Sequence, residues 1–177
     1  MRVASLWQLR DKPIAINHLK WYFNGKGKDL IEDANLNLML RTDGGVQAKI
    51  AKSIPDNQTK GKFTGYTTIT QDNYADEDFQ NAFGEIDRLD FEIDFDAGTV
   101  HAWFMDRYEW HPVYPFYERK DGDYVRGTNC VHAAAVELKT TGAHDYWMKG
   151  ETILPLKSIR SAAARNDPWR DPPWPGL

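Results

Sequence analysis

The clearest pattern along the chain is a strict alternation of apolar and acidic residues between positions 89 and 96. Leu89, Phe91, Ile93 and Phe95 alternate with Asp90, Glu92, Asp94 and Asp96. Side chains of a strand point alternately to opposite faces, so this pattern predicts a strand with one buried and one solvated face. Ala97-Gly98 then provides a turn, and residues 99–109 return as the antiparallel partner.

The return strand carries apolar side chains on both faces. Val100, Ala102 and Phe104 line one face, while Trp103 and Met105 lie on the other. We therefore expect the middle of this strand to be covered on both sides. The same alternation predicts that Asp106 and Tyr108 share a face, whereas Arg107 and Glu109 point the opposite way.

Helix signals are weaker in the first third of the chain. Residues 1–28 predict an irregular or short-element lead that ends at the breakers Asn24-Gly-Lys-Gly27. Residues 29–40 fit a helix loosely, with Asp29 as its cap. Gly44-Gly45 breaks that helix, and residues 46–54 predict a second, short helix that Pro55 stops.

Two further segments lie between these helices and the hairpin. Residues 63–71 are rich in threonine and aromatic residues, which favours a strand. Residues 72–84 are acidic and predict a loop with one helical turn.

The last third alternates between loops and regular elements. Residues 112–127 predict a long aromatic loop, after which Thr128 or Asn129 caps a helix that runs to about Thr141. Residues 151–159 predict a final strand, in which Pro155 marks an edge or a bulge.

These elements predict one compact α+β domain over residues 1–165, with a partly open, barrel-like antiparallel sheet and a few helices. Residues 166–177 hold four prolines and two tryptophans and form a C-terminal tail. A chain of 177 residues is long enough to bury a core without a metal or disulfide staple.

Composition narrows the choice of partners. The formal net charge is −4, which gives no overall attraction for phosphate backbones, so we expect no nucleic-acid partner. Cys130 is the single cysteine, so no intramolecular disulfide forms. The first residues lack the apolar stretch of a signal peptide, and we therefore expect synthesis in the bacterial cytoplasm without one.

The densest group of chemically active side chains lies between Asp106 and His111. Asp106, Tyr108, Glu109 and His111 stand among large aromatic residues. A carboxylate pair can hold a divalent metal ion or divide into acid and base, and a nearby histidine can transfer protons at neutral pH. The alternative is a salt bridge at the strand end, for example of Arg107 with a carboxylate, beside a surface histidine.

A second group surrounds the predicted helix start near residue 129. Arg126 precedes that start, Asn129 lies at the cap, and His132 lies in the first turn. Backbone N–H groups at a helix N-terminus favour an anion, so Arg126 and His132 can face one phosphate. The alternative is that Asn129 only caps the helix, Arg126 is a surface charge and His132 is an ordinary helix residue.

The sequence Asp106-Arg-Tyr108-Glu109 resembles the Asp-x-Tyr-Asp core of the colicin M family of bacterial toxins. Glu109 stands where that family has its second aspartate. The His-Arg pair that follows in the family is absent here, so His111 or His132 would take the place of its histidine. The surroundings are also similar to domains at the ends of bacterial polymorphic toxins and secreted effectors.

The resemblance implies an antibacterial effector domain that hydrolyses the phosphate linkage of lipid II, a peptidoglycan precursor, with the help of Mg²⁺. Asp106 and Glu109 would hold the metal, Tyr108 and His111 or His132 would complete the catalytic group, and Arg126 with Asn129 would bind the substrate phosphate.

The expected partners are a lipid-linked phosphate at the membrane surface, a cognate immunity protein and a secretion machinery that delivers the domain to the target-cell periplasm. Two alternatives stay open. One is a non-enzymatic binding module or structural component of a secretion or phage-like particle. The other is a toxin of another enzymatic class, such as a nuclease.

Overall fold

The fold is seen in a computed structural model, which describes residues 10–108, 117–120, 123–126 and 142–163. Side chains are described for residues 10–108 and 142–159. In chain order the main elements are α2 (Pro13–Asn24), β1 (Leu30–Ile31), α3 (Asp33–Thr42), α4 (Gly44–Lys52), β2 (Lys62–Ile69), η1 (Gln71–Asn73), α5 (Glu77–Phe83), β3 (Ile86–Asp94), β4 (Thr99–Tyr108), β5 (Tyr117–Lys120), β6 (Asp123–Arg126), β7 (Tyr146–Pro155) and α7 (Leu156–Ala163).

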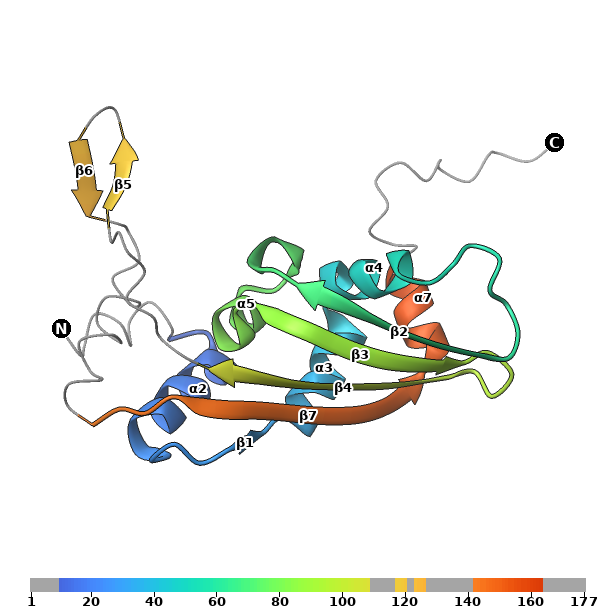
Figure 1. Ribbon diagram of the computed structural model, residues 1–177, viewed down its shortest axis with the longest axis horizontal. Coiled ribbons are helices and arrows are strands. Elements are labelled where there is room, and N and C mark those ends of the chain that lie inside the picture. The colour runs from blue at the N-terminus through green and yellow to red at the C-terminus, as the bar shows by residue number, and fades with distance from the viewer. Residues whose placement is uncertain (1–9, 109–116, 121–122, 127–141, 164–177) are drawn as a thin grey trace.

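A five-stranded mixed sheet forms the centre of the molecule, with the strand order β1-β7-β4-β3-β2 (Figure 1). The predicted hairpin is present, since β3 and β4 pair antiparallel from Leu89 opposite Phe104 to Asp94 opposite Thr99. Short β1 runs parallel to β7, a pairing that the sequence pattern did not indicate. The α+β class is confirmed, but the sheet stays open: β1 and β2 are separate edges, so no barrel closes.

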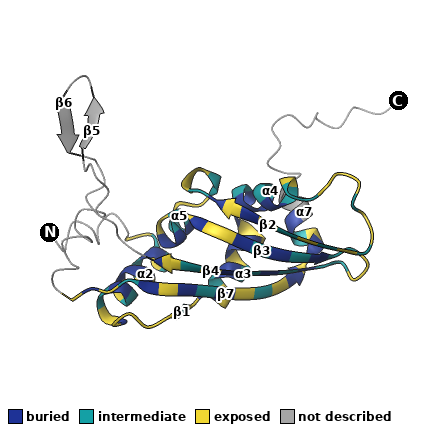
Figure 2. Ribbon diagram, viewed as in Figure 1, coloured by how far each residue is buried: buried dark blue, intermediate teal, exposed yellow. Residues whose placement is uncertain are grey.

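The core lies between one face of the sheet and the helices. Along β4 the inward side chains Val100, Ala102 and Phe104 are buried, and they alternate with partly or fully exposed neighbours (Figure 2). Helix α3 packs Leu36, Met39 and Leu40 into the same core. Burial of this apolar surface is the main source of stability.

The other face of the sheet is open to solvent. Met105 on β4 is 60% exposed, and Trp103 is only partly buried. The prediction that the middle of β4 is covered on both sides was therefore wrong, because the described helices pack on a single face.

The first third of the chain is more regular than the sequence suggested. Residues 13–24 form α2, in place of an irregular lead, and bury Ala15, His18, Leu19 and Tyr22 at helical spacing. A histidine and a tyrosine among these four positions weaken the apolar signal that a sequence pattern depends on. Asp29 caps no helix, since β1 intervenes before α3 begins.

The predicted break between two helices is present, since α3 ends at Thr42 and the short second helix, α4, begins at Gly44, two residues earlier than expected. Asp43 accepts hydrogen bonds from the N–H groups of Gly45 and Val46, and so caps α4. Gly45 lies against the segment after β2: a Cβ there would sit 2.1 Å from the carbonyl oxygen of Asn73. Glycine at this position therefore allows two backbones to pack closely at the boundary between the two helices.

The C-terminal elements also differ from expectation. The last strand starts five residues earlier, at Tyr146, and Pro155 ends it, so residues 156–159 are helical. The hairpin of β5 and β6 lies within the predicted loop 112–127. The predicted helix from 128 or 129 to 141 and the tail 166–177 lie outside the described residues. No helix in the described part is long and apolar enough to cross a membrane.

Candidate functional site

Asp106 and Tyr108 lie at the end of β4 and share the face of the sheet that meets the helices, as predicted. Asp106 is partly buried and its Oδ1 accepts a hydrogen bond from the backbone N–H of Arg107, 2.8 Å away. Tyr108 is 8% exposed. The alternation along the strand thus brings one carboxylate and one phenol to the same side of the protein.

The ring of Tyr108 is fixed by aromatic neighbours from two other elements. It stacks on Tyr146 of β7, with centroids 4.9 Å apart and planes 17° apart. His18 of α2 meets it edge-on at 5.5 Å, and Tyr22 lies at 6.3 Å. Stacked and edge-on pairs of this kind restrict a ring to one orientation, so the position of the Tyr108 side chain is well defined.

His18 is itself half of a buried ionisable pair. Its Nε2 atom lies 3.3 Å from Oε1 of Glu32, and the two side chains are 0% and 4% exposed. Neither ring nitrogen of His18 makes a well-aligned hydrogen bond to any described residue. The other carboxylate oxygen of Glu32 accepts from the side-chain amide of Asn35 at 2.6 Å. A polar pair kept out of water in this way is costly to bury and depends on both partners.

Asp106 and two other carboxylates affect the buried side chain of Tyr74. Burial raises the pKa of Tyr74 well above its usual value, and the negative charges of Asp43, Asp106 and Glu85 raise that pKa further. The hydroxyl of Tyr74 is buried and has no hydrogen-bond partner among the described residues. The charge of Asp106 therefore reaches the buried hydroxyl of Tyr74 on the inner side of the sheet.

The tyrosines behind this site remain protonated at neutral pH. Burial raises the pKa of Tyr146, and the neighbouring Tyr108 and Glu32 add to the effect. Burial also raises the pKa of Tyr22, with a contribution from Asp145. Both phenols therefore act as hydrogen-bond donors and not as bases.

An ion pair at the end of β4, which the sequence suggested as the alternative to a catalytic site, is also present. Arg107 points to the other side of β4, where its Nη2 atom lies 3.5 Å from Oδ2 of Asp145. This is the strand-end salt bridge with a carboxylate that the sequence suggested. It involves Asp145 in place of the carboxylates within the Asp106–Glu109 stretch.

The structure brings only part of the predicted site together. Glu109, His111, Asn129 and His132 lie outside the described residues. Arg126 is the last residue of β6, where its backbone pairs with Tyr117 of β5, and its side chain is not described.

Of the two proposed metal ligands, Asp106 has a partly buried carboxylate, and Glu109 lies outside the described residues. Within the described part of the chain no group of three His, Cys, Asp or Glu side chains is arranged to hold a metal ion.

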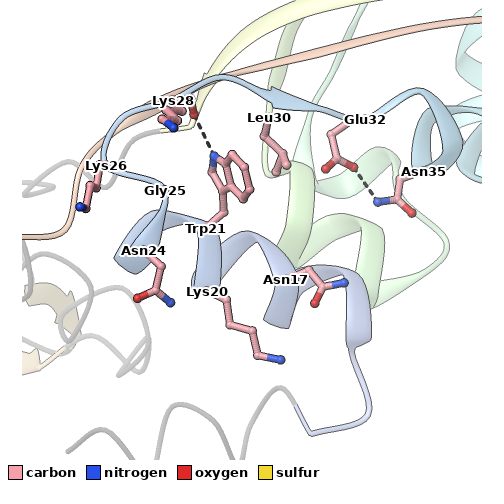
Figure 3. Close-up of a pocket in the computed structure, with 10 residues that line it drawn as sticks. All are labelled: Asn17, Lys20, Trp21, Asn24, Gly25, Lys26, Lys28, Leu30, Glu32 and Asn35. Atoms are coloured by element: carbon pink, nitrogen blue, oxygen red, sulfur yellow. Dashed lines mark hydrogen bonds between the residues drawn. The ribbon is translucent and has the colours of Figure 1, made fainter.

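The sequence predicted neither the buried His18–Glu32 pair nor the hollow beside Glu32. Glu32 and Asn35 line a hollow of about 650 Å³ between α2, the following loop and the start of α3 (Figure 3). Its remaining lining residues are Asn17, Lys20, Trp21, Asn24, Gly25, Lys26, Lys28 and Leu30. The usable signal was the repetition of Lys and Asn around the Gly25-Lys26-Gly27 turn, which the sequence alone does not connect to Glu32.

No protein-family model matches the chain, and neither a known curated protein nor a solved structure matches it.

Proposed function

We propose that this chain is an antibacterial effector domain that hydrolyses the phosphate linkage of lipid II in a metal-assisted reaction. One observation supports the proposal most: Asp106 and Tyr108, the first two functional positions of the colicin M-like motif, share one face at the end of β4. There the charge of Asp106 helps to raise the pKa of Tyr74, and Tyr108 is held by Tyr146 and His18.

Each residue of the motif has a role in the proposed reaction. Mg²⁺ held by Asp106 and Glu109 would neutralise charge on the phosphate oxygens. Arg126 and Asn129 would hold the phosphate, since a guanidinium binds such oxygens through two parallel hydrogen bonds. His111 or His132 would move the proton that hydrolysis requires. Tyr108, fixed by its stacked neighbour, would orient one of these groups.

The proposal includes a route to the substrate. Lipid-linked precursors with an exposed phosphate lie at the outer surface of the bacterial inner membrane, so the domain would act in the periplasm of a target cell. A secretion machinery would deliver it, and a cognate immunity protein would protect the producing cell.

Expression in two compartments of a bacterial host tests the toxin. We expect lysis when the chain is exported to the periplasm and normal growth when it stays in the cytoplasm. Asp106→Ala should abolish lysis. Asp87→Ala is the matched control, because Asp87 is an exposed carboxylate on neighbouring β3 and should leave toxicity intact. Killing by Asp106→Ala at parental level would refute the assigned site, and toxicity only in the cytoplasm would favour a nuclease or another intracellular toxin.

A second candidate function is a non-enzymatic binding module in a secretion or phage-like particle. The open face of the sheet favours it, because large apolar side chains on four different strands stand in solvent there: Ile31, Tyr66, Met105, Trp147 and Ile153. Exposed apolar surface of this kind is typical of interaction sites. This candidate predicts no toxicity in either compartment and a stable complex with a co-encoded particle protein, which Met105→Lys should weaken and Asp106→Ala should not.

A further inference from the structure

The edge of the sheet that β2 forms is open. β2 ends the strand order β1-β7-β4-β3-β2, and among the described residues no strand lies beyond it (Figure 1). The N–H of Phe95 donates to the carbonyl oxygen of Gly61, so the peptide groups of Gly61 face β3. Because the peptide groups of an antiparallel strand alternate in direction, those of every second residue of β2 face away from the sheet: Lys62, Thr64, Tyr66 and Thr68. None of these outward groups has a backbone hydrogen-bond partner in another described element.

β2 has little of the protection that exposed edge strands usually carry. Charges, prolines, short length and bulges keep most such edges from pairing with another chain. β2 has eight residues, no proline and a single charge, Lys62, at its start. The bulge between Thr67 and Ile69 leaves β2 itself regular, because the extra residue belongs to β3, where two residues lie opposite Thr68. The outer edge of β2 can therefore accept another strand.

The same edge leaves aromatic surface accessible on both faces of the sheet. Tyr66 is 61% exposed, with the guanidinium of Arg88 over its ring at 4.6 Å from the centroid. On the inner face Phe63 is only partly buried, and its ring centroid lies 6.2 Å from that of Phe91. A strand beside β2 would cover part of both rings, and burial of aromatic surface favours association.

We propose that β2 pairs antiparallel with β2 of a second copy of this chain, around a two-fold axis at Gly65, so that the two sheets become one. Outward-facing residues must lie opposite one another to exchange hydrogen bonds. With this axis all four outward residues are paired across the interface: Lys62 with Thr68, and Thr64 with Tyr66. An axis at the next residue would place Lys62 opposite a residue beyond the end of β2. The dimer goes beyond the proposed hydrolysis of lipid II and does not depend on it.

A second copy fits this edge because the facing side chains complement one another. Lys62 faces a threonine, so no like charges lie opposite each other. Tyr66 faces Thr64 of the second copy, and a pair of an aromatic and a β-branched residue stabilises neighbouring strands. Gly65 meets itself at the axis, where no side chain obstructs the approach of the two backbones. The interface is therefore self-complementary, as a two-fold dimer requires.

Sedimentation equilibrium of the full chain tests the dimer, and two matched variants locate it. Tyr66→Lys places like charges close together across the axis and should weaken the dimer about tenfold or more. Met105→Lys is the control, because Met105 is equally exposed, at 60%, but lies on the inner strand β4; it should weaken the dimer less than about twofold. A dissociation constant weaker than about 1 mM for the parent chain would overturn the proposal. Equal effects of the two variants would place the contact on the open face of the sheet and would also overturn it.

Amide hydrogen exchange followed by NMR tests which edge pairs. The outward N–H groups of Thr64 and Tyr66 should exchange more slowly as the protein concentration rises, because they become hydrogen-bonded only in the dimer. The Thr64 amide should lose this dependence on concentration in Tyr66→Lys. If both amides exchange at constant rates while the parent chain dimerises, another surface forms the dimer and the proposal is wrong.

Discussion

At the scale of single residues, two buried polar groups are placed at a cost, and both border the candidate site. Tyr74 buries a hydroxyl with no hydrogen-bond partner among the described residues, and His18 lies beside Glu32 without a well-aligned hydrogen bond. A buried polar group that has lost its water and gained no partner costs about 1–3 kcal/mol. Buried polar groups without a full set of partners are often found at functional sites.

Tyr74→Phe removes the unpaired hydroxyl but keeps the packed ring. We expect the free energy of unfolding to rise by about 1 kcal/mol, because a desolvated hydroxyl near Asp43 and Asp106 disappears. Urea denaturation measures the change. Tyr66→Phe is the control, since Tyr66 is 61% exposed and should show no gain. Destabilisation by Tyr74→Phe would mean that its hydroxyl has a partner in the native state.

His18→Leu leaves the carboxylate of Glu32 buried with Asn35 as its remaining partner. We expect a loss of about 3 kcal/mol in the free energy of unfolding, as is typical when one member of a buried pair is removed. The double variant His18→Leu/Glu32→Leu should lose less than the single variant, because no charge is then stranded. A double variant that is less stable than His18→Leu would show that the two side chains do not act as a pair.

At the scale of elements, Asp43 connects three segments of the chain. Its carboxylate accepts from the N–H groups of Gly45 and Val46 at the start of α4, and from those of Ala75 and Asp76 just before α5. One side chain thus caps a helix and fastens the loop after β2. The glycines at 44 and 45 correctly predicted a break between two helices, but the sequence does not reveal this long-range contact.

Asp43→Ala should therefore cost more than the loss of an ordinary helix cap. One buried and three partly buried N–H groups lose their acceptor, and we expect a decrease of about 3 kcal/mol in the free energy of unfolding. Asp76→Ala is the comparison, since Asp76 caps α5 through the N–H of Asp78 alone and should cost about 1 kcal/mol. Similar losses in both variants, measured by urea denaturation, would contradict the connecting role of Asp43.

The packing of α2 against β7 predicts how stability depends on pH. Burial raises the pKa of Tyr22 and of Tyr146 above the unfolded value, so both stay protonated longer in the folded state. Their contribution is complete below the unfolded pKa of about 10 and is lost as the pH rises above it, by about 1.4 kcal/mol per pH unit for each tyrosine. Tyr146→Phe should reduce the dependence of the free energy of unfolding on pH above pH 10 by about 1.4 kcal/mol per pH unit, which is the contribution of one tyrosine. Urea denaturation at several alkaline pH values measures this change. An unchanged slope would mean that Tyr146 ionises freely in the folded protein.

At the scale of the whole molecule, the helices cover one face of the sheet and leave the other open. The strands were predictable because the alternation of Leu89 to Phe95 with acidic residues is local. The same local rule placed Asp106 and Tyr108 on one face. It gave no information on which face the helices cover, so it misjudged Trp103 and Met105.

The contacts that define the site depend on distant parts of the chain. Tyr108 meets His18 across 90 positions in the sequence, and β1, which precedes Glu32, pairs with β7 near the other end of the chain. A pattern of single residues cannot supply such pairings. The remaining proposed catalytic residues, Glu109, His111 and His132, stay predictions, as does the role of Arg126.

The most direct test of the central claim is the hydrolysis of purified lipid II by the purified chain. We predict release of the phosphorylated headgroup in the presence of Mg²⁺ and loss of release when a chelator is added. Asp106→Asn should retain the fold and lower the rate by about a hundredfold or more, whereas Asp87→Asn should match the parent. Intact lipid II after incubation with the parent chain and Mg²⁺, or cleavage by Asp106→Asn at the parental rate, would contradict the account.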